Sequence, residues 1–498
     1  MSIESLRDWI DLLRREGELL EVAAEVDPYL EVTEIVDRTV KDRGPALLFR
    51  NVKGSSMPIL INQFGTERRM CLALGVDRLD EVGERIADVL EMQPPQGLAD
   101  KVRSLGKLKS FVDSIPRTVG KAPCQEVVVT DGATLDDLPI MTCWPDDGGP
   151  YITLPSVITK DPVTGGRNVG MYRLQKHSST TLGLHWQIHK DAAADWRAGA
   201  GRMEVAIVLG ADPVSTYAGS APIPKHIDEL MVAGFLRGEP VETVACKTVD
   251  LKVPAHAEIV LEGYCERGEL APEGPFGDHT GYYTPVEPFP VFRLTAVTHR
   301  RDPIYPSIVV GVPPQEDEWL GKATERIFLP ALRMTMPEIV DYDLPAAGAF
   351  HNCAIVSIRK AYPGHARKVM HAIWGTGLLS LTKAVVVVDD WVDVHDYPQV
   401  MWQVGANVDP ARDVQLSEGP LDHLDHAPTR QFVGGKIGFD ATRTWVEEGY
   451  TREWPEVVRM RDDVRSRVDA RWEALGLGTP PAASASRTSR RGRFGRRR

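Results

Sequence analysis

A long central block of short β-branched runs constrains this fold more than any other feature. Between residue 126 and about residue 310, turn residues separate the runs EVVVT, ITLPSVIT, NVGMYRLQ, MEVAIVLG, EIVLEGY, VFRLTAVTH and PSIVVGV. Such runs, bounded by Gly, Pro and Asp, are typical of strands. The sequence DPVTGG at 161–166 predicts a hairpin connection in which glycine supplies a positive φ. We therefore expect a β-rich middle domain, either a barrel or a sandwich.

The regions on either side of this block combine helical and strand patterns. Two groups of apolar residues near the N-terminus recur at helical spacing and predict amphipathic helices: Leu6, Trp9, Ile10 and Leu13, then Val32, Ile35, Val36 and Val40. Strand runs follow in ALLF at 46–49 and PILI at 58–61. After Pro313, strand and helix patterns alternate in CAIVSI, HARKVMHAIW, AVVVVDD and YPQVMWQVGA. This alternation favours a sheet covered by helices, so we expect an α/β domain at each end.

Changes in these patterns define the expected domains. They are an N-terminal α/β domain at 1–115, the β-rich domain at 116–312 and a C-terminal α/β domain at 313–478. Residues 479–498 form an Arg- and Ser-rich tail whose composition predicts disorder. Before the tail, apolar residues three or four apart predict a terminal amphipathic helix: Val457, Met460, Val464, Val468, Trp472 and Leu475. This helix is expected to pack either on a partner subunit or on its own domain.

Charge and composition exclude several classes of protein. The chain is 43% hydrophobic and 26% charged, as in ordinary globular proteins, and its net charge is -12. The tail after residue 480 holds seven arginines and no acid, so the rest of the chain is more acidic still. An acidic surface does not attract a phosphate backbone, which argues against nucleic acid as a partner of the folded body.

Cysteine usage and the N-terminal sequence favour a cytoplasmic protein. The six cysteines include no C-x-x-C pair, so we expect reduced thiols and neither a zinc knuckle nor a disulfide framework. The N-terminus mixes acids and bases and lacks the apolar centre of a secretory signal. No apolar stretch reaches the roughly 18 residues expected of a membrane span.

The stretch EGPFGDHTGYY at 273–283 is the most informative motif. Two acids, Glu273 and Asp278, are separated by Gly, Pro, Phe and Gly, which exclude a regular helix. A tight loop of this kind can aim both carboxylates inward, where neighbouring acids can have their pKa values driven apart. The alternative is a surface turn with solvated acids, and spacing alone favours that alternative.

A second group of polar residues lies in RNVGMYRLQ and HWQIH. His185 and His189 are four residues apart and would share a face of a helix or a strand, but Trp186 replaces the Glu of a zinc-protease motif. Taken from spacing alone, these histidines are structural more often than they are ligands. Asn168 and Arg173 are five apart, which sends them to opposite faces of an ideal strand. If both serve one site, the strand must end, twist or bulge between them.

Other motifs are weaker. GTG at 375–377 does not match the dinucleotide-binding fingerprint, and no G-x-S-x-G elbow is present. VVVVDDWVDVHD at 385–396 departs from the EF-hand pattern, so a buried strand with a polar exit is the better interpretation.

These motifs resemble those of the UbiD family of prenylated-FMN-dependent decarboxylases. The resemblance rests on NVGMYRLQ, HWQIHKD, DELMVAGFLRG and, most specifically, EGPFGDHTGYY. It extends to about residue 478 through LRREGELLEV, MTCWPDDGGPYIT, AVVVVDDWVDV, VDPARD and GGKIGFDATRTW. The resemblance implies an N-terminal α/β domain, a central split β-barrel of the flavin-reductase type and a C-terminal α/β domain whose last helix helps to form a dimer.

The resemblance also implies a metal and a flavin. Asn168, His189 and Glu229 are expected to bind a divalent cation that holds the cofactor phosphate. These hard ligands suit Mn²⁺ or Mg²⁺ better than Zn²⁺, and K⁺ is expected nearby. Residues beside the ligands are expected to contact the flavin, with Arg173: Met171, Tyr172, His185, Trp186, Gln187 and Lys190.

Arg173, Glu273 and Asp278 are the catalytic residues that the resemblance implies. Arg173 is expected to orient the substrate carboxylate and to hold Glu273 ionised, and Asp278 is expected to act as the general acid. The prenylated flavin supplies the electron sink. The short side chain of Asp278, where some members have Glu, favours aromatic over acrylic substrates.

The implied activity is that of a carboxy-lyase: reversible, non-oxidative decarboxylation of an aromatic acid, with release of carbon dioxide. The expected substrate is of the hydroxybenzoate type or a polyprenyl-hydroxybenzoate in ubiquinone or menaquinone biosynthesis, and a polyprenylated substrate implies peripheral membrane contact. The alternatives are a heteroaromatic, naphthoic or acrylic acid, or a non-catalytic flavin-binding assembly protein. A flavin prenyltransferase of the UbiX type is the expected cofactor supplier, and a homodimer or higher homo-oligomer is the expected assembly.

Overall fold

The computed structural model describes residues 3–90, 112 and 114–477, and these form two compact units. The first unit contains the described residues through Ala331 together with Ala346–Phe350 and Asp422–Ala427. The second contains Leu332–Pro345, His351–Leu421 and the described residues from Pro428 onward. The first unit therefore combines the regions expected to form the N-terminal and central domains.

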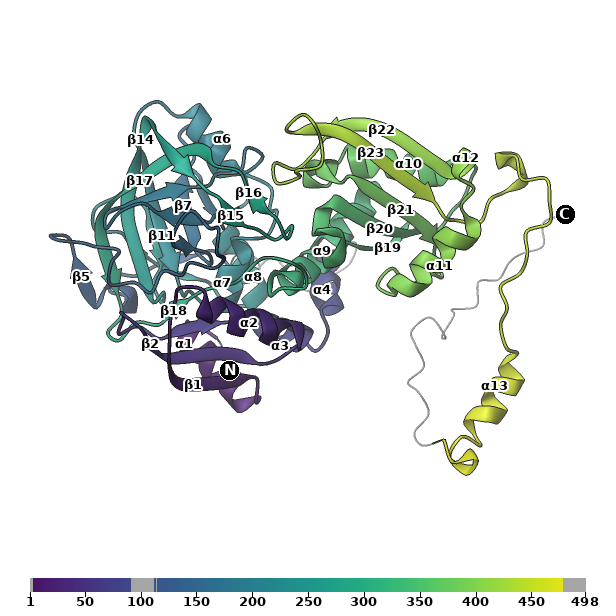
Figure 1. Ribbon diagram of the computed structural model, residues 1–498, viewed down its shortest axis with the longest axis horizontal. Coiled ribbons are helices and arrows are strands. Elements are labelled where there is room, and N and C mark those ends of the chain that lie inside the picture. The colour runs from purple at the N-terminus through teal and green to yellow at the C-terminus, as the bar shows by residue number, and fades with distance from the viewer. Residues whose placement is uncertain (1–2, 91–111, 113, 478–498) are drawn as a thin grey trace, which may run out of the picture. The chain divides into compact units, whose positions relative to one another are not determined.

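The N-terminal part of the first unit is a four-stranded sheet with helices, and it contains the two helices and two strands that the sequence predicts (Figure 1). The sheet order is β1-β2-β3-β18, with β1 (Leu19–Val26), β2 (Ala46–Val52), β3 (Ile59–Ile61) and β18 (Tyr305–Pro306). The helices are α1 (Leu6–Arg15), α2 (Glu31–Lys41), α3 (Glu67–Leu74) and α4 (Asp80–Leu90). Ser5 caps α1 by accepting a hydrogen bond from the Asp8 amide, and α1 buries all four of its predicted apolar positions.

The run PSIVVGV corrects one expectation. It was expected to be a strand of the β-rich domain, but the strand there, β18, ends at Pro306 and pairs in parallel with β3 of the N-terminal sheet. Ser307 continues this contact by donating its amide proton to the carbonyl of Leu60. An apolar run shows that a segment is buried but does not show which sheet covers it.

The β-rich block forms one nine-stranded sheet of order β6-β9-β10-β17-β14-β11-β7-β8, with β5 paired to β17. The strands are β5 (Val127–Val129), β6 (Tyr151–Ile152), β7 (Ser156–Lys160), β8 (Arg167–Gly170), β9 (Leu174–Lys176), β10 (Thr181–Leu184), β11 (Met203–Leu209), β14 (Ile259–Glu273) and β17 (Glu287–His299). The predicted hairpin at 161–166 is confirmed, because β7 pairs antiparallel with β8 and Gly165 has a φ of 72°.

This sheet is strongly curled. In a flat sheet, the six steps from β9 to β8 would separate these strands by about 29 Å at roughly 4.8 Å per step. Residues 171–173 alone join the two strands, and the four Cα–Cα steps from Gly170 to Leu174 span at most about 15 Å. The ends of the sheet therefore approach each other, although no ladder among the described residues closes it into a barrel. The split-barrel description stays a prediction.

Smaller elements complete the first unit. A three-stranded sheet has the order β13-β12-β4, and a hairpin pairs β15 with β16. Their bounds are β4 (Arg117–Thr118), β12 (Glu242–Ala245), β13 (Lys252–Pro254), β15 (Phe276–Gly277) and β16 (Tyr283–Thr284). The helices are α6 (Asp191–Ala198), α7 (Pro213–Ala218), α8 (Glu229–Arg237) and α9 (Asp317–Thr335), which runs past the end of this unit.

The second unit has the predicted alternation of strands and helices. Its five-stranded sheet has the order β19-β20-β21-β23-β22, in which β20, β21 and β23 are parallel. The strands are β19 (Ile339–Asp343), β20 (Cys353–Ile358), β21 (Ala384–Asp389), β22 (Val414–Pro420) and β23 (Val433–Asp440). The helices are α10 (His365–Trp374), α11 (Tyr397–Asn407), α12 (Pro410–Asp413) and α13 (Asp462–Asp469).

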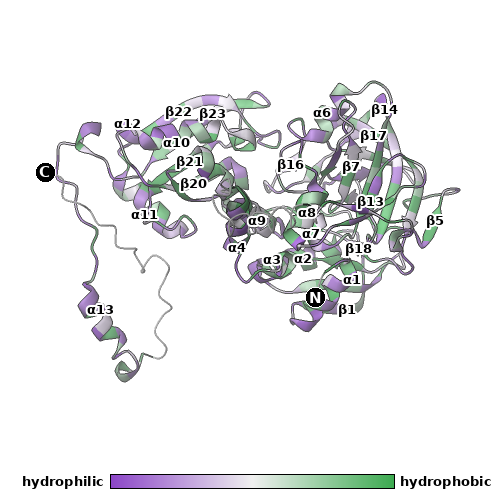
Figure 2. Cartoon of the chain, turned by 180° about the vertical axis from the view of Figure 1, so that it is seen from behind, coloured by the Kyte–Doolittle hydropathy of each residue, from purple (hydrophilic) through white to green (hydrophobic). Residues whose placement is uncertain are grey.

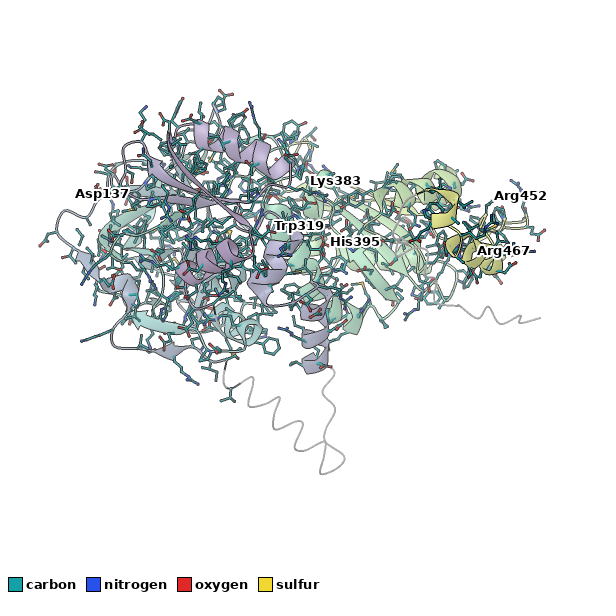
Figure 3. The ribbon with its side chains drawn as sticks, turned by 90° about the horizontal axis from the view of Figure 1, so that it is seen from below. Asp137, Trp319, Lys383, His395, Arg452 and Arg467 are labelled. Atoms are coloured by element: carbon teal, nitrogen blue, oxygen red, sulfur yellow. The ribbon has the colours of Figure 1, made fainter. Side chains whose placement is uncertain are left out.

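The terminal helix is shorter than its apolar pattern suggests. Helix α13 has no buried residue, and its ribbon includes both hydrophilic and hydrophobic residues (Figure 2). Arg467 lies on this helix (Figure 3). Val458, before the helix, is 100% exposed. The stripe is therefore not packed on its own domain, and the dimerisation role expected for it stays a prediction. The expected disordered tail lies outside the described residues.

Helix length and hydropathy also bear on membrane contact. Among the residues that the structure describes, no helix is both long enough and apolar enough to cross a bilayer.

Candidate active site

The motif at 273–283 forms a compact loop and hairpin between the two longest strands. Glu273 ends β14, and the hairpin pairs Phe276 with Thr284. Gly274 has a φ of 104°, and a Cβ there would lie 2.7 Å from the carbonyl oxygen of Pro285. Only glycine therefore fits at this turn, which directs the chain back across the end of β14.

Arg173 brings both acids of this motif together. Its Nε and Nη2 donate to the two carboxylate oxygens of Glu273 at 2.9 and 3.1 Å, and its Nη1 donates to Asp278 Oδ2 at 2.5 Å. Nη2 also donates to Thr284 Oγ1 at 2.9 Å. The side chains of Arg173, Glu273 and Asp278 are 8%, 0% and 10% exposed, so the alternative of solvated acids is wrong.

The odd spacing of Asn168 and Arg173 is resolved by the end of a strand. Asn168 lies in β8, which stops at Gly170, and Arg173 lies just before β9. The strand pattern therefore does not have to place both side chains on one face.

Both acids of this network are ionised at neutral pH. Burial favours the neutral form of Glu273, but the hydrogen bond from His185 and the charge of Arg173 lower its pKa to about 2. Burial likewise opposes ionisation of Asp278, but the hydrogen bond and charge of His279, followed by the charge of Arg173, hold its pKa far below the usual range. The general-acid role expected of Asp278 thus requires a proton that Asp278 does not itself carry in this state.

His279 is a site residue that the sequence argument did not single out. Its backbone N–H donates to Asp278 Oδ1 at 2.7 Å, and its Nδ1 lies 2.9 Å from the same oxygen. Burial lowers the pKa of His279, but Asp278, Asp317 and Asp422 raise it to about 9. Its position inside the most informative motif, directly after Asp278, is the signal that could have identified it.

His185 contacts the network from the other side. It follows β10, and its Nδ1 lies 3.0 Å from Glu273 Oε2. Burial and the charge of Arg173 lower the pKa of His185, so the ring is neutral and its Nδ1 donates to the carboxylate. The ring packs on Phe289, with centroids 4.3 Å apart, and stacks on His423 at 5.6 Å.

Segment 422–427 also reaches this site, and no local signal predicts it. It lies between β22 and β23 in the chain but belongs to the first unit. Asp422 accepts two hydrogen bonds from Gln187 Nε2, at 3.1 and 2.9 Å, and His423 Nε2 lies 2.5 Å from Glu287 Oε2. Because 235 residues separate Gln187 from Asp422, only the folded chain brings them together.

Two of the three predicted metal ligands lie together. Asn168 donates to Thr159 Oγ1 at 3.0 Å, and the next residue, Val169, donates its amide proton to Glu229 Oε2 at 3.0 Å. His189 lies in an exposed turn between β10 and α6. His185 is buried, so the expectation that these two histidines share one face is wrong, because the chain is in neither a helix nor a strand at 185–190.

Glu229 is a buried acid that accepts a hydrogen bond from a backbone amide. It is 4% exposed, and no basic side chain within the described ranges pairs with it. Burial raises the pKa of Glu229 to about 8. The Glu229 carboxylate and the Asn168 amide oxygen are hard oxygen donors, which fit the divalent cation expected here.

The residues expected to contact a flavin occupy two short segments beside this network. They are Met171 and Tyr172 after β8, and Trp186, Gln187 and Lys190 after β10. Tyr172 and Trp186 are buried, and Trp186 packs edge-on against Trp196 at 5.4 Å. Burial lowers the pKa of Lys190. An amphipathic ring with a phosphate fits this mixture of apolar and basic side chains.

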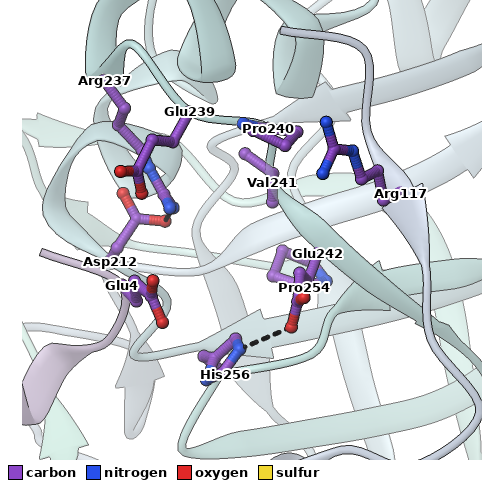
Figure 4. Close-up of a pocket in the computed structure, with 10 residues that line it drawn as sticks. All are labelled: Glu4, Arg117, Asp212, Arg237, Glu239, Pro240, Val241, Glu242, Pro254 and His256. Carbon is purple, nitrogen blue, oxygen red and sulfur yellow. Dashed lines mark hydrogen bonds and ion pairs between the residues drawn. The ribbon is translucent and has the colours of Figure 1, made fainter. Parts of the chain in front are cut away.

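One cavity lies apart from these residues and shares none of them. It has a volume of about 280 Å³, and it is lined by the ion pairs of Asp212 with Arg237 and of Glu242 with His256 (Figure 4). His256 Nε2 lies 3.0 Å from Glu242 Oε2. The Arg173 network is therefore not part of the lining of this cavity.

The chain matches three family descriptions along its length. Residues 10–86, 117–313 and 318–441 match, in turn, the N-terminal domain, the Rift-related domain and the C-terminal domain of 3-octaprenyl-4-hydroxybenzoate carboxy-lyase, UbiD. An uncharacterized protein of Archaeoglobus fulgidus is 56% identical over 480 residues, which cover 95% of this chain and 99% of that protein.

Solved structures are similar over nearly the whole chain. The UbiD-class enzyme HmfF from Pelotomaculum thermopropionicum, in complex with FMN, is 32% identical with a TM-score of 0.77 and covers 91% of this chain and 97% of its own. An evolved dimeric form of HmfF contains prFMN, with 31% identity, a TM-score of 0.74 and the same coverage. Vanillic acid decarboxylase of Sedimentibacter hydroxybenzoicus, in closed form, is 27% identical with a TM-score of 0.82 and covers 95% of this chain and 99% of its own.

The buried arginine with two acids, the order of the motifs and these matches along the chain agree with one another. The chain belongs to the UbiD family of carboxy-lyases.

Proposed function

We propose that this protein is a prenylated-FMN-dependent, reversible decarboxylase of an aromatic acid of the hydroxybenzoate type. The observation that carries the proposal is the buried Arg173–Glu273–Asp278 network beside the two segments expected to hold the flavin. The FMN and prFMN bound to HmfF support the cofactor, and the activity named for the vanillic acid decarboxylase supports the substrate class.

The cofactor and metal are assigned to residues whose chemistry suits them. Met171, Tyr172, Trp186, Gln187 and Lys190 hold the flavin, together with His185 and Arg173. Asn168, His189 and Glu229 hold Mn²⁺ or Mg²⁺ at the cofactor phosphate, with K⁺ nearby. When bound, the prenylated flavin supplies an electron sink for breaking the bond between the carboxylate and the ring.

The side chains then divide the remaining tasks. Arg173 keeps Glu273 ionised and supplies positive charge close to the substrate carboxylate. His185 holds Glu273 in place through Nδ1. Asp278 delivers a proton to the ring carbon after carbon dioxide leaves, and burial excludes water that would compete for that step.

The exposed terminal segment supports self-association. Val458, Met460, Val468 and Leu475 are 100%, 60%, 40% and 47% exposed, and a second copy of this chain would cover such a surface. This assigns a homo-oligomeric contact to the region around α13.

Co-expression with a flavin prenyltransferase of the UbiX type, followed by a substrate screen, tests the function. The screen contains 4-hydroxybenzoic, vanillic, 3,4-dihydroxybenzoic, furoic, naphthoic and cinnamic acids, scored by carbon dioxide release and by exchange of labelled bicarbonate into the acid. We expect turnover of a hydroxybenzoic acid and its loss in Glu273→Gln, with His256→Gln as the matched control. Bound prenylated FMN without turnover of any acid would instead favour a flavin-binding assembly protein.

A further inference from the structure

Asp278 lacks a proton of its own to deliver. Its Oδ2 accepts from Arg173 Nη1 at 2.5 Å, and its Oδ1 accepts from the backbone of His279 at 2.7 Å. Both oxygens therefore face donors, which stabilise the carboxylate rather than the acid. A decarboxylation that ends in protonation of carbon needs a nearby group that can protonate Asp278.

His279 is placed to be that group. Its Nδ1 lies 2.9 Å from Asp278 Oδ1, within hydrogen-bond distance. Its side chain is 19% exposed, so part of the ring reaches solvent while the rest is enclosed. The ring also packs near Phe350, with centroids 5.7 Å apart.

The charges around His279 come from three separate elements. Asp278 precedes it in its own loop, Asp317 begins α9, and Asp422 lies in segment 422–427. All three act to stabilise the imidazolium. The like charge of Arg173, which pairs with Asp278, acts in the opposite direction on physical grounds. Burial raises the pKa of Asp317 to about 7, and His279 acts in the opposite direction. These charges therefore keep the His279 ring protonated, as an imidazolium, near neutral pH.

We propose that His279 supplies the proton that Asp278 transfers to the substrate carbon, so that the two residues act as a relay. This proposal rests on the proposed function. Once carbon dioxide has left, the ring carbon holds the electron pair of the broken carbon–carboxylate bond, and the prenylated flavin, when bound, would stabilise that pair. Nδ1–H of His279 passes its proton to Asp278 Oδ1, and Asp278 delivers this proton to the ring carbon, where the electron pair forms the new C–H bond. The neutral imidazole then takes a proton from water. No oxidant or reductant is consumed.

The first test uses the cofactor-loaded enzyme and the variant His279→Gln. Glutamine can still donate a hydrogen bond to Asp278, but it cannot release a proton. We expect kcat to fall by about 10² or more, KM to change by less than about threefold, and added imidazole to restore part of the rate. The wild-type kcat should decline as pH rises through about 9, and this decline should be absent from the variant.

His256→Gln is the matched control. His256 also pairs with a carboxylate, since its Nε2 lies 3.0 Å from Glu242 Oε2, but it lies outside this network. It should leave kcat and its pH profile unchanged. Equal kcat and equal pH profiles in wild type and His279→Gln would overturn the relay while leaving the decarboxylase intact. An inactive wild-type enzyme with bound cofactor would overturn the proposed function instead.

The second test needs neither cofactor nor activity. Nitrogen-15 NMR of the flavin-free protein reports the protonation of His279, assigned by comparison with His279→Gln or, if that variant does not fold, with His279→Asn. We expect imidazolium at pH 7.5 in wild type, and a lower titration point in Asp278→Asn. A neutral His279 at pH 7.5, or a titration point that Asp278→Asn leaves unchanged, would overturn the relay whatever the activity.

Discussion

Glu273 and Glu229 are both buried in the first unit, yet their surroundings drive their pKa values in opposite directions. Glu273 is 0% exposed, and His185 and Arg173 lower its pKa to about 2 in spite of burial. Glu229 is 4% exposed, and burial raises its pKa to about 8 because the backbone amide of Val169 is a weaker partner than a guanidinium. Burial alone therefore does not decide the charge of an acid.

The two acids differ in their partners: Glu273 is paired with a cationic side chain, whereas Glu229 accepts from a backbone amide. Around Arg173 the chain supplies its own counter-charges, so the network can form before any ligand binds. Around Glu229 the observed donor is a backbone amide, and burial favours the neutral carboxyl group. The first region is thus an ionised network in the protein alone, whereas the metal that we propose for the second region would favour the ionised form of Glu229.

The largest expected effect comes from removing the cation of the first region. Arg173→Ala leaves two buried carboxylates without their partner, and we expect it to lower the free energy of unfolding by about 3–5 kcal/mol in urea titrations at pH 7.5. Arg461→Ala, which breaks an exposed pair with Asp463, should change it by less than about 1 kcal/mol. Equal effects of the two substitutions would break the comparison, because the network would then contribute no more than a surface pair.

The next largest effect is a pH dependence of the free energy of unfolding that arises from His279 in the first region. His279 has a folded pKa of about 9, above its ordinary value of 6.5. Its stabilising contribution is complete below pH 6.5 and is lost as pH rises through about 9, for a total of up to about 3 kcal/mol. Urea unfolding at pH 6.5 and 9.5 should therefore show a larger loss in wild type than in His279→Gln. A loss that is the same in both proteins would contradict the assignment.

A smaller effect should appear when the second region receives its cation. Adding Mn²⁺ in the presence of FMN, at about 100 times the dissociation constant, should stabilise the folded protein by about 2.7 kcal/mol and raise the melting temperature. Glu229→Gln should abolish this shift, whereas Glu242→Gln, which alters a more exposed acid, should preserve it. A full shift in Glu229→Gln would show that the metal binds elsewhere.

The smallest effect on stability is expected at an exposed residue of the second unit. Val458 is 100% exposed, so Val458→Asp should change the free energy of unfolding by less than about 0.5 kcal/mol. The same substitution should weaken self-association, measured by analytical ultracentrifugation, because it places a charge on the apolar surface. An unchanged oligomer would remove this segment from the interface.

Much of the fold follows from local patterns. The spacing of Leu6, Trp9, Ile10 and Leu13 was sufficient to predict α1, and the turn at 161–166 was sufficient to predict the hairpin of β7 and β8. The run after Tyr305 was assigned to the wrong sheet, because strand partners are chosen by long-range packing. The terminal helix was predicted too long, because its pattern has no surface within its own unit to stabilise it.

The candidate site was predictable only in part. The motif named Glu273 and Asp278, but spacing could not show that both are buried on Arg173. Asp317 and Asp422 had no local signal, since they come from elements that meet this loop only in the folded chain.

The amino-acid sequence by itself determined the alternation of helices and strands, the family motifs and the residue types available for chemistry, because each depends on neighbours along the chain. The tertiary structure alone decided which acids hold a charge. The physical reason is that a pKa depends on burial and on charges within a few ångströms, and those charges are contributed by segments that lie more than a hundred residues apart.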